Sequence, residues 1–141
     1  METQYWRERA TMKIVTDQEF QSAVLKRFMD KYVKEGTGFR DEQGNRTLLG
    51  CSLKDNYYDD CVLIKTEDIP KLGLQNNLPI YVYFDGSEEL FVTTYRGFCQ
   101  YIKSLEEWEY NDTEVFDDTL EWLIYVTHDD TSMLVGFNED E

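Results

Sequence analysis

The side chains that could hold a metal ion or perform catalysis are few and widely spaced. A structural zinc site needs four ligands at short paired spacings, and Cys51, Cys61, Cys99 and His128 do not have such spacings. A Cys, His and Asp catalytic set drawn from Cys99, His128 and Asp129 is a combination that a chain of 141 residues offers by chance. We therefore predict no metal, no cofactor and no catalytic residue, and interpret the cysteines as reduced thiols.

Clustered carboxylates make calcium a stronger candidate than zinc, since hard cations prefer oxygen ligands. Such clusters occur at 85–89, at Asp59 with Asp60, and at Asp129 with Asp130. None of them follows the pattern of the twelve-residue calcium loop, so we interpret them as fortuitous weak sites. The glycines do not fit the phosphate-binding patterns GxxxxGK[ST] or GxGxxG.

The most specific candidate site is a run of acidic residues near the C-terminus. From Ser104 to Glu141 the chain has thirteen Asp and Glu residues and no Lys or Arg, and its formal net charge is −15. Like charges repel in the compact state and create a field that attracts basic molecules and repels nucleic acid and anionic membranes. Aromatic anchors among carboxylates suit a basic partner. The predicted partner-binding residues are Glu106, Glu107, Trp108, Glu109, Tyr110, Asp112, Glu114, Asp117 and Asp118.

Two other interpretations of this acidic run stay open. In one, it is a solvated loop whose aromatic side chains turn inward. In the other, the first predicted helix packs near it and neutralises part of the charge internally. The basic residues that would do so are Lys26, Arg27, Lys31 and Lys34.

Length and composition predict one folded domain, 1–141. The 41% hydrophobic and 15% aromatic content is too high for a disordered acidic chain. We expect a flexible lead at 1–12, with Met12 as a second possible start, and an acidic tail at 138–141. The chain shows neither an apolar stretch long enough to span a membrane nor a signal peptide, so we expect a cytoplasmic protein.

The hydrophobic periodicity predicts two helices and about six strands. One helix covers 17–34, with Thr16 as its cap and an apolar stripe formed by Phe20, Val24, Phe28 and Tyr32. A second covers 95–108, with Thr94 as its cap. The predicted strands are 47–53, 61–66, 78–84, 89–95, 121–127 and 132–137. Short turns between several of them, such as the one at Asp85 and Gly86 between 78–84 and 89–95, favour hairpins. The predicted fold class is α+β, a mostly antiparallel sheet with two helices packed on one face.

The segments 78–105 and 121–137 resemble the strand, helix and strand organisation of small acidic bacterial immunity proteins of toxin–immunity systems, including the SUKH group. The resemblance covers about half of the chain and rests on pattern and composition. It implies a non-enzymatic protein that binds a cognate toxin, often a nuclease, and blocks its active site. The usual features near the start of SUKH proteins are absent, so no binding residue is carried over.

The hypothesis from the sequence is therefore a non-enzymatic inhibitor of bacterial or phage origin. It would dock its C-terminal acidic surface on a basic partner, such as a nuclease or another nucleic-acid-binding toxin, without binding nucleic acid or membrane itself. One alternative is a phage-type mimic of DNA charge, and another is an acidic secretion chaperone, which would expose an apolar groove and form a homodimer. A third is a small enzyme with a carboxylate-lined pocket, favoured if Asp85, Asp129 or His128 converge with shifted pKa values.

Overall fold

One antiparallel sheet forms the frame of the protein. The computed structural model describes residues 12–34, 53–106 and 109–137. Within these ranges seven strands pair in the order β1-β4-β3-β5-β6-β7-β2, and every neighbouring pair is antiparallel. The strands are β1 (Lys13–Ile14), β2 (Val62–Lys65), β3 (Pro79–Phe84), β4 (Glu89–Thr94), β5 (Thr113–Phe116), β6 (Leu123–Val126) and β7 (Thr131–Val135). The predicted α+β class is confirmed, with slightly more strands than expected.

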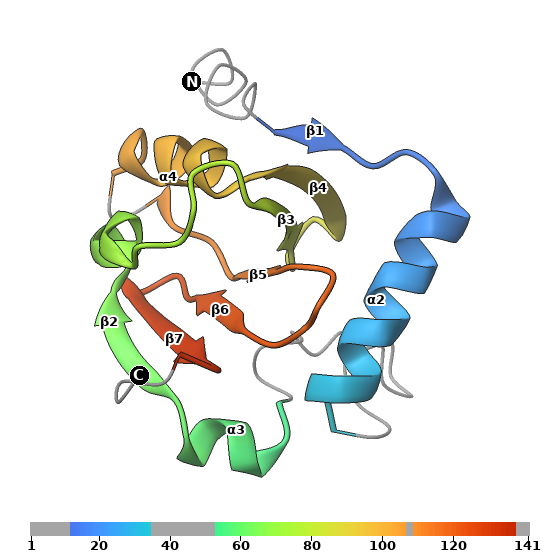
Figure 1. Ribbon diagram of the computed structural model, residues 1–141, viewed down its shortest axis with the longest axis horizontal. Coiled ribbons are helices and arrows are strands. Elements are labelled where there is room, and N and C mark those ends of the chain that lie inside the picture. Colours follow the sequence, from blue (N-terminus) through green and yellow to red (C-terminus); the bar gives the residue numbers. More distant parts are fainter. Residues whose placement is uncertain (1–11, 35–52, 107–108, 138–141) are drawn as a thin grey trace.

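The two longer helices lie on opposite faces of this sheet, so the prediction that both cover one face is wrong. Figure 1 shows α2 (Gln18–Tyr32) and α4 (Tyr95–Lys103) well apart. Side chains alternate along a strand, and Val82 packs with the α4 side while Tyr83, the next residue, packs with the α2 side. The short helix α3 (Asp55–Asp59) and the 3-10 helix η2 (Thr66–Lys71) were not predicted.

The first predicted helix is confirmed as α2, with a different cap. The N-cap residue is Asp17, not Thr16. The Asp17 Oδ1 accepts hydrogen bonds from the backbone N–H groups of Glu19 at 3.0 Å and Phe20 at 3.2 Å. Phe20, the first member of the predicted apolar stripe, is 44% exposed. The other three members, Val24, Phe28 and Tyr32, are buried.

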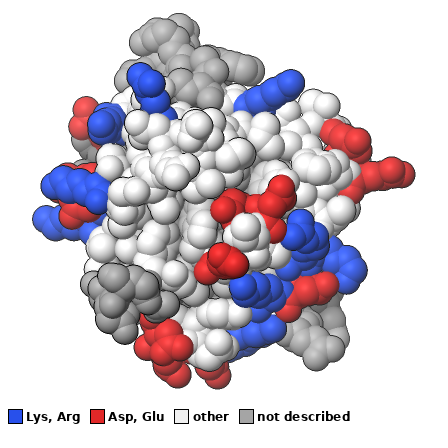
Figure 2. All heavy atoms as spheres, viewed as in Figure 1, with Lys and Arg blue, Asp and Glu red and all other residues white. Residues whose placement is uncertain are grey.

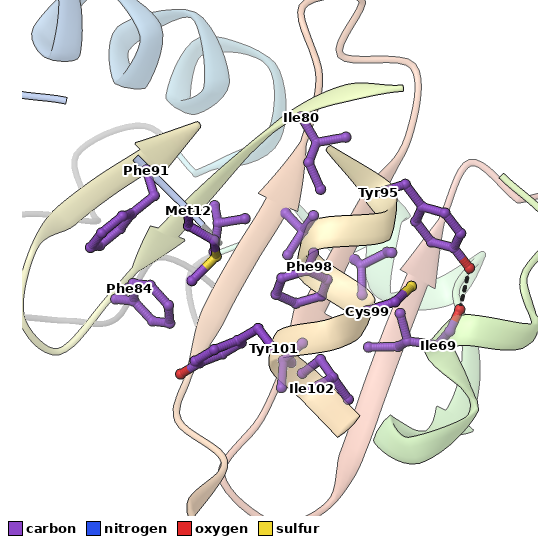
Figure 3. Packing of buried hydrophobic residues seen from close by; sticks show 14 of the residues in the cluster. Met12, Ile69, Ile80, Phe84, Phe91, Tyr95, Phe98, Cys99, Tyr101 and Ile102 are labelled. Carbon is purple, nitrogen blue, oxygen red and sulfur yellow. Dashed lines mark hydrogen bonds between the residues drawn. The ribbon is translucent and has the colours of Figure 1, made fainter. Parts of the chain in front are cut away.

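The second predicted helix is confirmed as α4 but ends at Lys103. Its predicted cap is also confirmed, because the Thr94 hydroxyl accepts from the Gly97 N–H at 3.1 Å. Figure 3 shows its apolar side against the strands, and the Tyr95 hydroxyl donating to the Ile69 carbonyl of η2 at 2.5 Å. The labelled side chains of this core include Phe84, Phe91, Phe98, Tyr101 and Ile102.

The predicted hairpins are confirmed as β3–β4 and β6–β7. The strand predicted at 47–53 lies outside the described residues except for Leu53, which makes an isolated bridge with Val33. Met12, expected in the flexible lead, is buried in the α4-side core, and the rest of that predicted lead lies outside the described residues. β5 was not predicted, and its position decides where the acidic residues lie.

Candidate functional site

A central strand divides the acidic run, so the run does not form one continuous surface. β5 lies between β3 and β6, and all four of its residues are buried. Asp112 stands just before this strand, while Asp117 and Asp118 directly follow it. The four-residue strand, roughly 13 Å long, therefore lies between the backbone positions of the carboxylates before and after it.

Three of the predicted partner-binding residues are buried, and their assignment to an exposed surface is wrong. Tyr110 belongs to the α4-side core, Glu114 is fully buried, and Asp117 is 8% exposed. Glu114 is buried because of its register in the sheet. It lies between Tyr83 of β3 and Tyr125 of β6, on the face that α2 covers. These three side chains cannot meet a partner in this conformation.

Two of the acidic residues that follow α4, Glu106 and Glu109, are joined by a hydrogen bond. Glu109 is half-buried, and its Oε1 accepts a hydrogen bond from the backbone N–H of the exposed Glu106 at 2.8 Å. Glu106 also lines a shallow hollow of about 290 Å³ together with Lys103. Glu107 and Trp108, predicted as contact residues, lie outside the described residues.

Asp112 pairs with His128 at the start of β5. The Asp112 Oδ1 accepts from the His128 backbone N–H at 3.1 Å and lies 3.2 Å from its Nδ1. The Asp112 side chain is 11% exposed, while that of His128 is 75% exposed. Asp129, in the same turn, accepts from the Thr127 hydroxyl, which lowers the carboxyl pKa of Asp129. This arrangement is a solvent-facing turn that the histidine and Asp112 hold together.

In the part of the chain that the structure describes, no three His, Cys, Asp or Glu side chains are placed to share a metal ion. The candidate zinc ligands Cys61 and Cys99 are free thiols, and burial raises the pKa of the Cys99 thiol. Cys51 lies outside the described residues.

The turn at 117–121, which joins β5 to β6, is held by the side chain of Asp117. Its Oδ1 accepts from the Thr119 backbone N–H at 3.0 Å and from the Thr119 hydroxyl at 2.6 Å. Its Oδ2 accepts from the Trp122 indole N–H at 3.1 Å. Asp117 is thus a structural residue that fixes the turn, and these hydrogen bonds explain how its carboxylate can be buried.

Basic and polar side chains of α2 donate hydrogen bonds to the backbone carbonyls of this turn. The Arg27 Nη2 donates to the Asp118 carbonyl at 2.7 Å, and the Tyr32 hydroxyl donates to the Leu120 carbonyl at 2.7 Å. Lys31 donates to the same Leu120 carbonyl. Leu120 has φ of 55°, a left-handed backbone conformation that is uncommon for a bulky residue. The turn is therefore held in an unusual shape by α2.

A hollow of about 300 Å³ opens between the start of α2, the strands β3 and β4, and the turn 117–121. Two aromatic rings, those of Phe20 and Tyr81, lie in its lining with their centroids 6.2 Å apart. The lining also includes apolar side chains, such as Val92, and the acidic residues Asp117 and Asp118. The hollow thus combines aromatic, aliphatic and anionic groups.

Asp118 is the charged group of this hollow that remains accessible. Its Oδ1 accepts from the Tyr81 hydroxyl at 2.7 Å and lies 3.7 Å from the Arg27 Nη1. Its side chain is 74% exposed, and its Oδ2 has no hydrogen bond among the described residues. Because an exposed ion pair at this distance is weak, about 0–1 kcal/mol, the carboxylate keeps most of its capacity to bind a second cation.

Of the basic residues that could neutralise the acidic run, Arg27 is the one that forms an ion pair with it among the described residues, whereas Lys26 and Lys34 pair with acids elsewhere. Lys26 pairs with Asp30 at 3.1 Å, Arg27 with Asp118, and Lys34 with Asp55 at 3.1 Å. On the face shown in Figure 2, acidic and basic atoms are interspersed on the side of α2. The predicted acidic surface is therefore partly neutralised at the Asp118 end.

Four lining or neighbouring residues were not predicted as part of a site: Phe20, Arg27, Tyr81 and Thr119. The sequence held a signal for Phe20 as a surface residue of the site, since it belongs to the apolar stripe of α2 but lies at the exposed end of that stripe. Tyr81 carried none, because its contact with Asp118 depends on the pairing of β3 with β5, in which Tyr81 faces Phe116. Long-range register of this kind is not encoded in local periodicity.

We expect the stability of the protein to fall in alkaline solution. Burial, followed by the hydrogen bond to Asp118, raises the pKa of Tyr81 to about 12, and burial raises that of Tyr95 to about 12 and that of Tyr32 further. Because these folded-state values exceed the ordinary value of 10.0, the stabilisation is fully present below pH 10 and is lost as the pH rises towards 12.

Urea unfolding at a series of pH values, with phenolate formation followed by ultraviolet absorbance, measures this loss. Tyr81→Phe should flatten the decline in part, and Tyr95→Phe likewise. A free energy of unfolding that stays constant up to pH 12 in the wild type would show that the three phenols are not protected by the fold.

No family model, no curated protein and no solved structure matches this chain. No helix among the described residues is long and apolar enough to cross a membrane.

Proposed function

We propose that this protein is a non-enzymatic inhibitor that docks on a basic partner protein and blocks it by occlusion. The partner would be a nuclease or another nucleic-acid-binding toxin, as for an immunity protein, and the two would meet in the cytoplasm. The docking surface is centred on the hollow between α2 and the turn 117–121, rather than on the whole acidic run. The observation that carries the proposal is Asp118, an exposed carboxylate at the rim of an aromatic hollow.

The charge of the chain supports the same proposal. A formal net charge of −15, with thirteen Asp and Glu and no Lys or Arg from Ser104 onward, weakens folding through self-repulsion. It also attracts a basic protein before contact, which speeds association and makes the rate fall steeply between low and physiological salt. Bound across a basic active site, the protein would exclude nucleic acid by its bulk and by its charge.

The distribution of exposed apolar side chains favours this proposal over a secretion chaperone. The large apolar residues that are exposed in the described ranges are Ile14 on β1, Phe20 on α2 and Leu63 on β2. β1 and β2 are the two opposite edges of the sheet. These side chains therefore do not combine into one groove that spans the molecule, which a chaperone would present to an effector.

A capture experiment from the native host tests the proposal. The tagged wild type should recover a basic protein at low salt and release it at high salt. The double variant Asp118→Asn with Glu121→Gln removes the two exposed charges of the turn 117–121 and should recover at least about tenfold less partner, since hydrogen bonds to charged groups are worth about 1.5–3 kcal/mol each. The recovered protein, if an enzyme, should lose its activity when the wild type is added.

The matched control is Asp59→Asn with Asp60→Asn, which removes the same charge from exposed positions at the end of α3. It should retain the partner. Equal losses in the two double variants would show that net charge alone matters and that the hollow is not the docking surface. Failure to recover any basic protein, at any salt concentration, would contradict the proposed function.

A further inference from the structure

We infer that the hollow between α2 and the turn 117–121 receives an arginine side chain of the partner. Because the owner of that arginine is the basic protein proposed above, the inference rests on the proposed function. It specifies the chemistry of the contact: a guanidinium group that binds the Asp118 carboxylate while its stem packs on the apolar wall.

The size and lining of the hollow suit one long side chain. Its volume, about 300 Å³, is at the lower limit of the range of about 300–1,000 Å³ that is usual for small-molecule pockets. One wall is apolar and includes Pro79 and Val92, and the acidic residues stand at the end formed by the turn. An arginine or lysine has the matching shape, an apolar stem with a charged head.

Asp118 is the hydrogen-bond acceptor for the charged end of such a side chain. The carboxylate of Asp117 is buried and already accepts hydrogen bonds on both oxygens, from Thr119 and Trp122, so it contributes mainly charge. The Tyr81 hydroxyl uses the Oδ1 of Asp118, and the Oδ2 has no hydrogen bond among the described residues. One carboxylate oxygen is thus available at the rim of the hollow.

Two features favour arginine over lysine. Phe20 and Tyr81 offer aromatic rings, on which a planar guanidinium stacks better than an ammonium group. Arg27 of the same chain already places a guanidinium against Asp118, with its Nη2 2.7 Å from the carbonyl and its Nη1 3.7 Å from Oδ1. The turn can therefore accommodate a guanidinium group. Because the Arg27–Asp118 pair is exposed, Asp118 can bind the partner's guanidinium together with Arg27 or in its place.

A titration of the full-length chain followed by nuclear magnetic resonance tests the inference. The probes are N-acetylarginine amide, the matching lysine derivative, and the matching citrulline derivative, which has the same shape as arginine without the charge. The arginine probe should cause saturable shifts of the Phe20 and Tyr81 ring signals, with an affinity several-fold higher than the lysine probe. The citrulline probe should cause none.

Variants separate binding from folding. Asp118→Asn keeps an acceptor for the Tyr81 hydroxyl but removes the charge, and should weaken arginine binding about tenfold. Asp59→Asn with Asp60→Asn should bind unchanged. Thermal unfolding of each variant confirms that the fold is kept.

Three results would overturn the inference: no saturable ring shifts, equal shifts with the citrulline probe, or unchanged binding by Asp118→Asn. A lysine probe that binds more tightly than the arginine probe would overturn the assignment of the side chain. If the capture experiment recovers a basic partner but the hollow ignores arginine, only this inference fails. If arginine binds in the hollow but no basic partner exists, the proposed function fails instead.

Discussion

Replacing Phe28 by alanine should lower the free energy of unfolding by about 3–5 kcal/mol, the usual cost of removing a fully buried phenylalanine. Phe28 has no exposed surface, and its ring stacks on Phe116 of β5 with centroids 4.7 Å apart. It also packs against Tyr32, at 5.2 Å. These contacts anchor α2 on the sheet, so the variant should also weaken the hydrogen bonds from α2 to the turn 117–121.

Urea unfolding followed by circular dichroism measures this loss. The matched control is Phe20→Ala on the same helix, which removes a side chain that is 44% exposed and should cost clearly less. Equal costs for the two variants would mean that α2 is not anchored through Phe28.

Replacing Gly136 by alanine should cost at least about 2 kcal/mol, through backbone strain and overpacking together. Gly136 has φ of 85°, and a Cβ atom there would lie 2.2 Å from the backbone carbonyl oxygen of Glu121. Because the obstacle is backbone rather than a flexible side chain, either the end of β7 or the segment before β6 must shift. That segment begins in the turn 117–121, so the variant should also weaken the capture of a basic partner.

The control is Gly86→Ala, since an added Cβ at Gly86 meets open space. Its effect on stability should stay within about 0.5 kcal/mol. Thermal unfolding of both variants makes the comparison. A neutral effect of Gly136→Ala would mean that the close approach to Glu121 is relieved at little cost.

Elements with strong local signals could be predicted from the sequence. The turn at Asp85 and Gly86 between two alternating segments fixed the β3–β4 hairpin, because a short connection forces antiparallel pairing. Thr94 marked the start of α4 for a similarly local reason. At the start of α2 the cap is Asp17 and not the predicted Thr16, because both residue types can cap a helix and periodicity does not fix a helix end to one residue.

The strand β5 could not be predicted, and neither could the real position of the acidic residues. Its sequence, Thr113–Phe116, is short and contains Glu114, a residue type that is rarely buried. Its place between β3 and β6 comes from pairing with strands elsewhere in the chain. Treating the segment as a loop placed its carboxylates on one surface, whereas the strand buries Glu114 and separates Asp112 from Asp118.

The hollow depends on the same long-range pairing. The register that places Tyr81 opposite Phe116 also brings the Tyr81 hydroxyl to Asp118. The packing of α2 on that face then supplies Phe20 and Arg27. The hollow combines carboxylates with aromatic neighbours, but its rings are those of Phe20 and Tyr81 and not those of the predicted Trp108 and Tyr110.

The most direct test of the central claim is a hydrogen-exchange footprint of the protein in complex with the basic partner that it captures. Docking on the hollow predicts slower exchange of backbone amides in the turn 117–121 and in the first half of α2, with little change on β2 at the far side of the sheet. Protection confined to β2, or to the turn that holds His128, with the turn 117–121 unchanged, would contradict it.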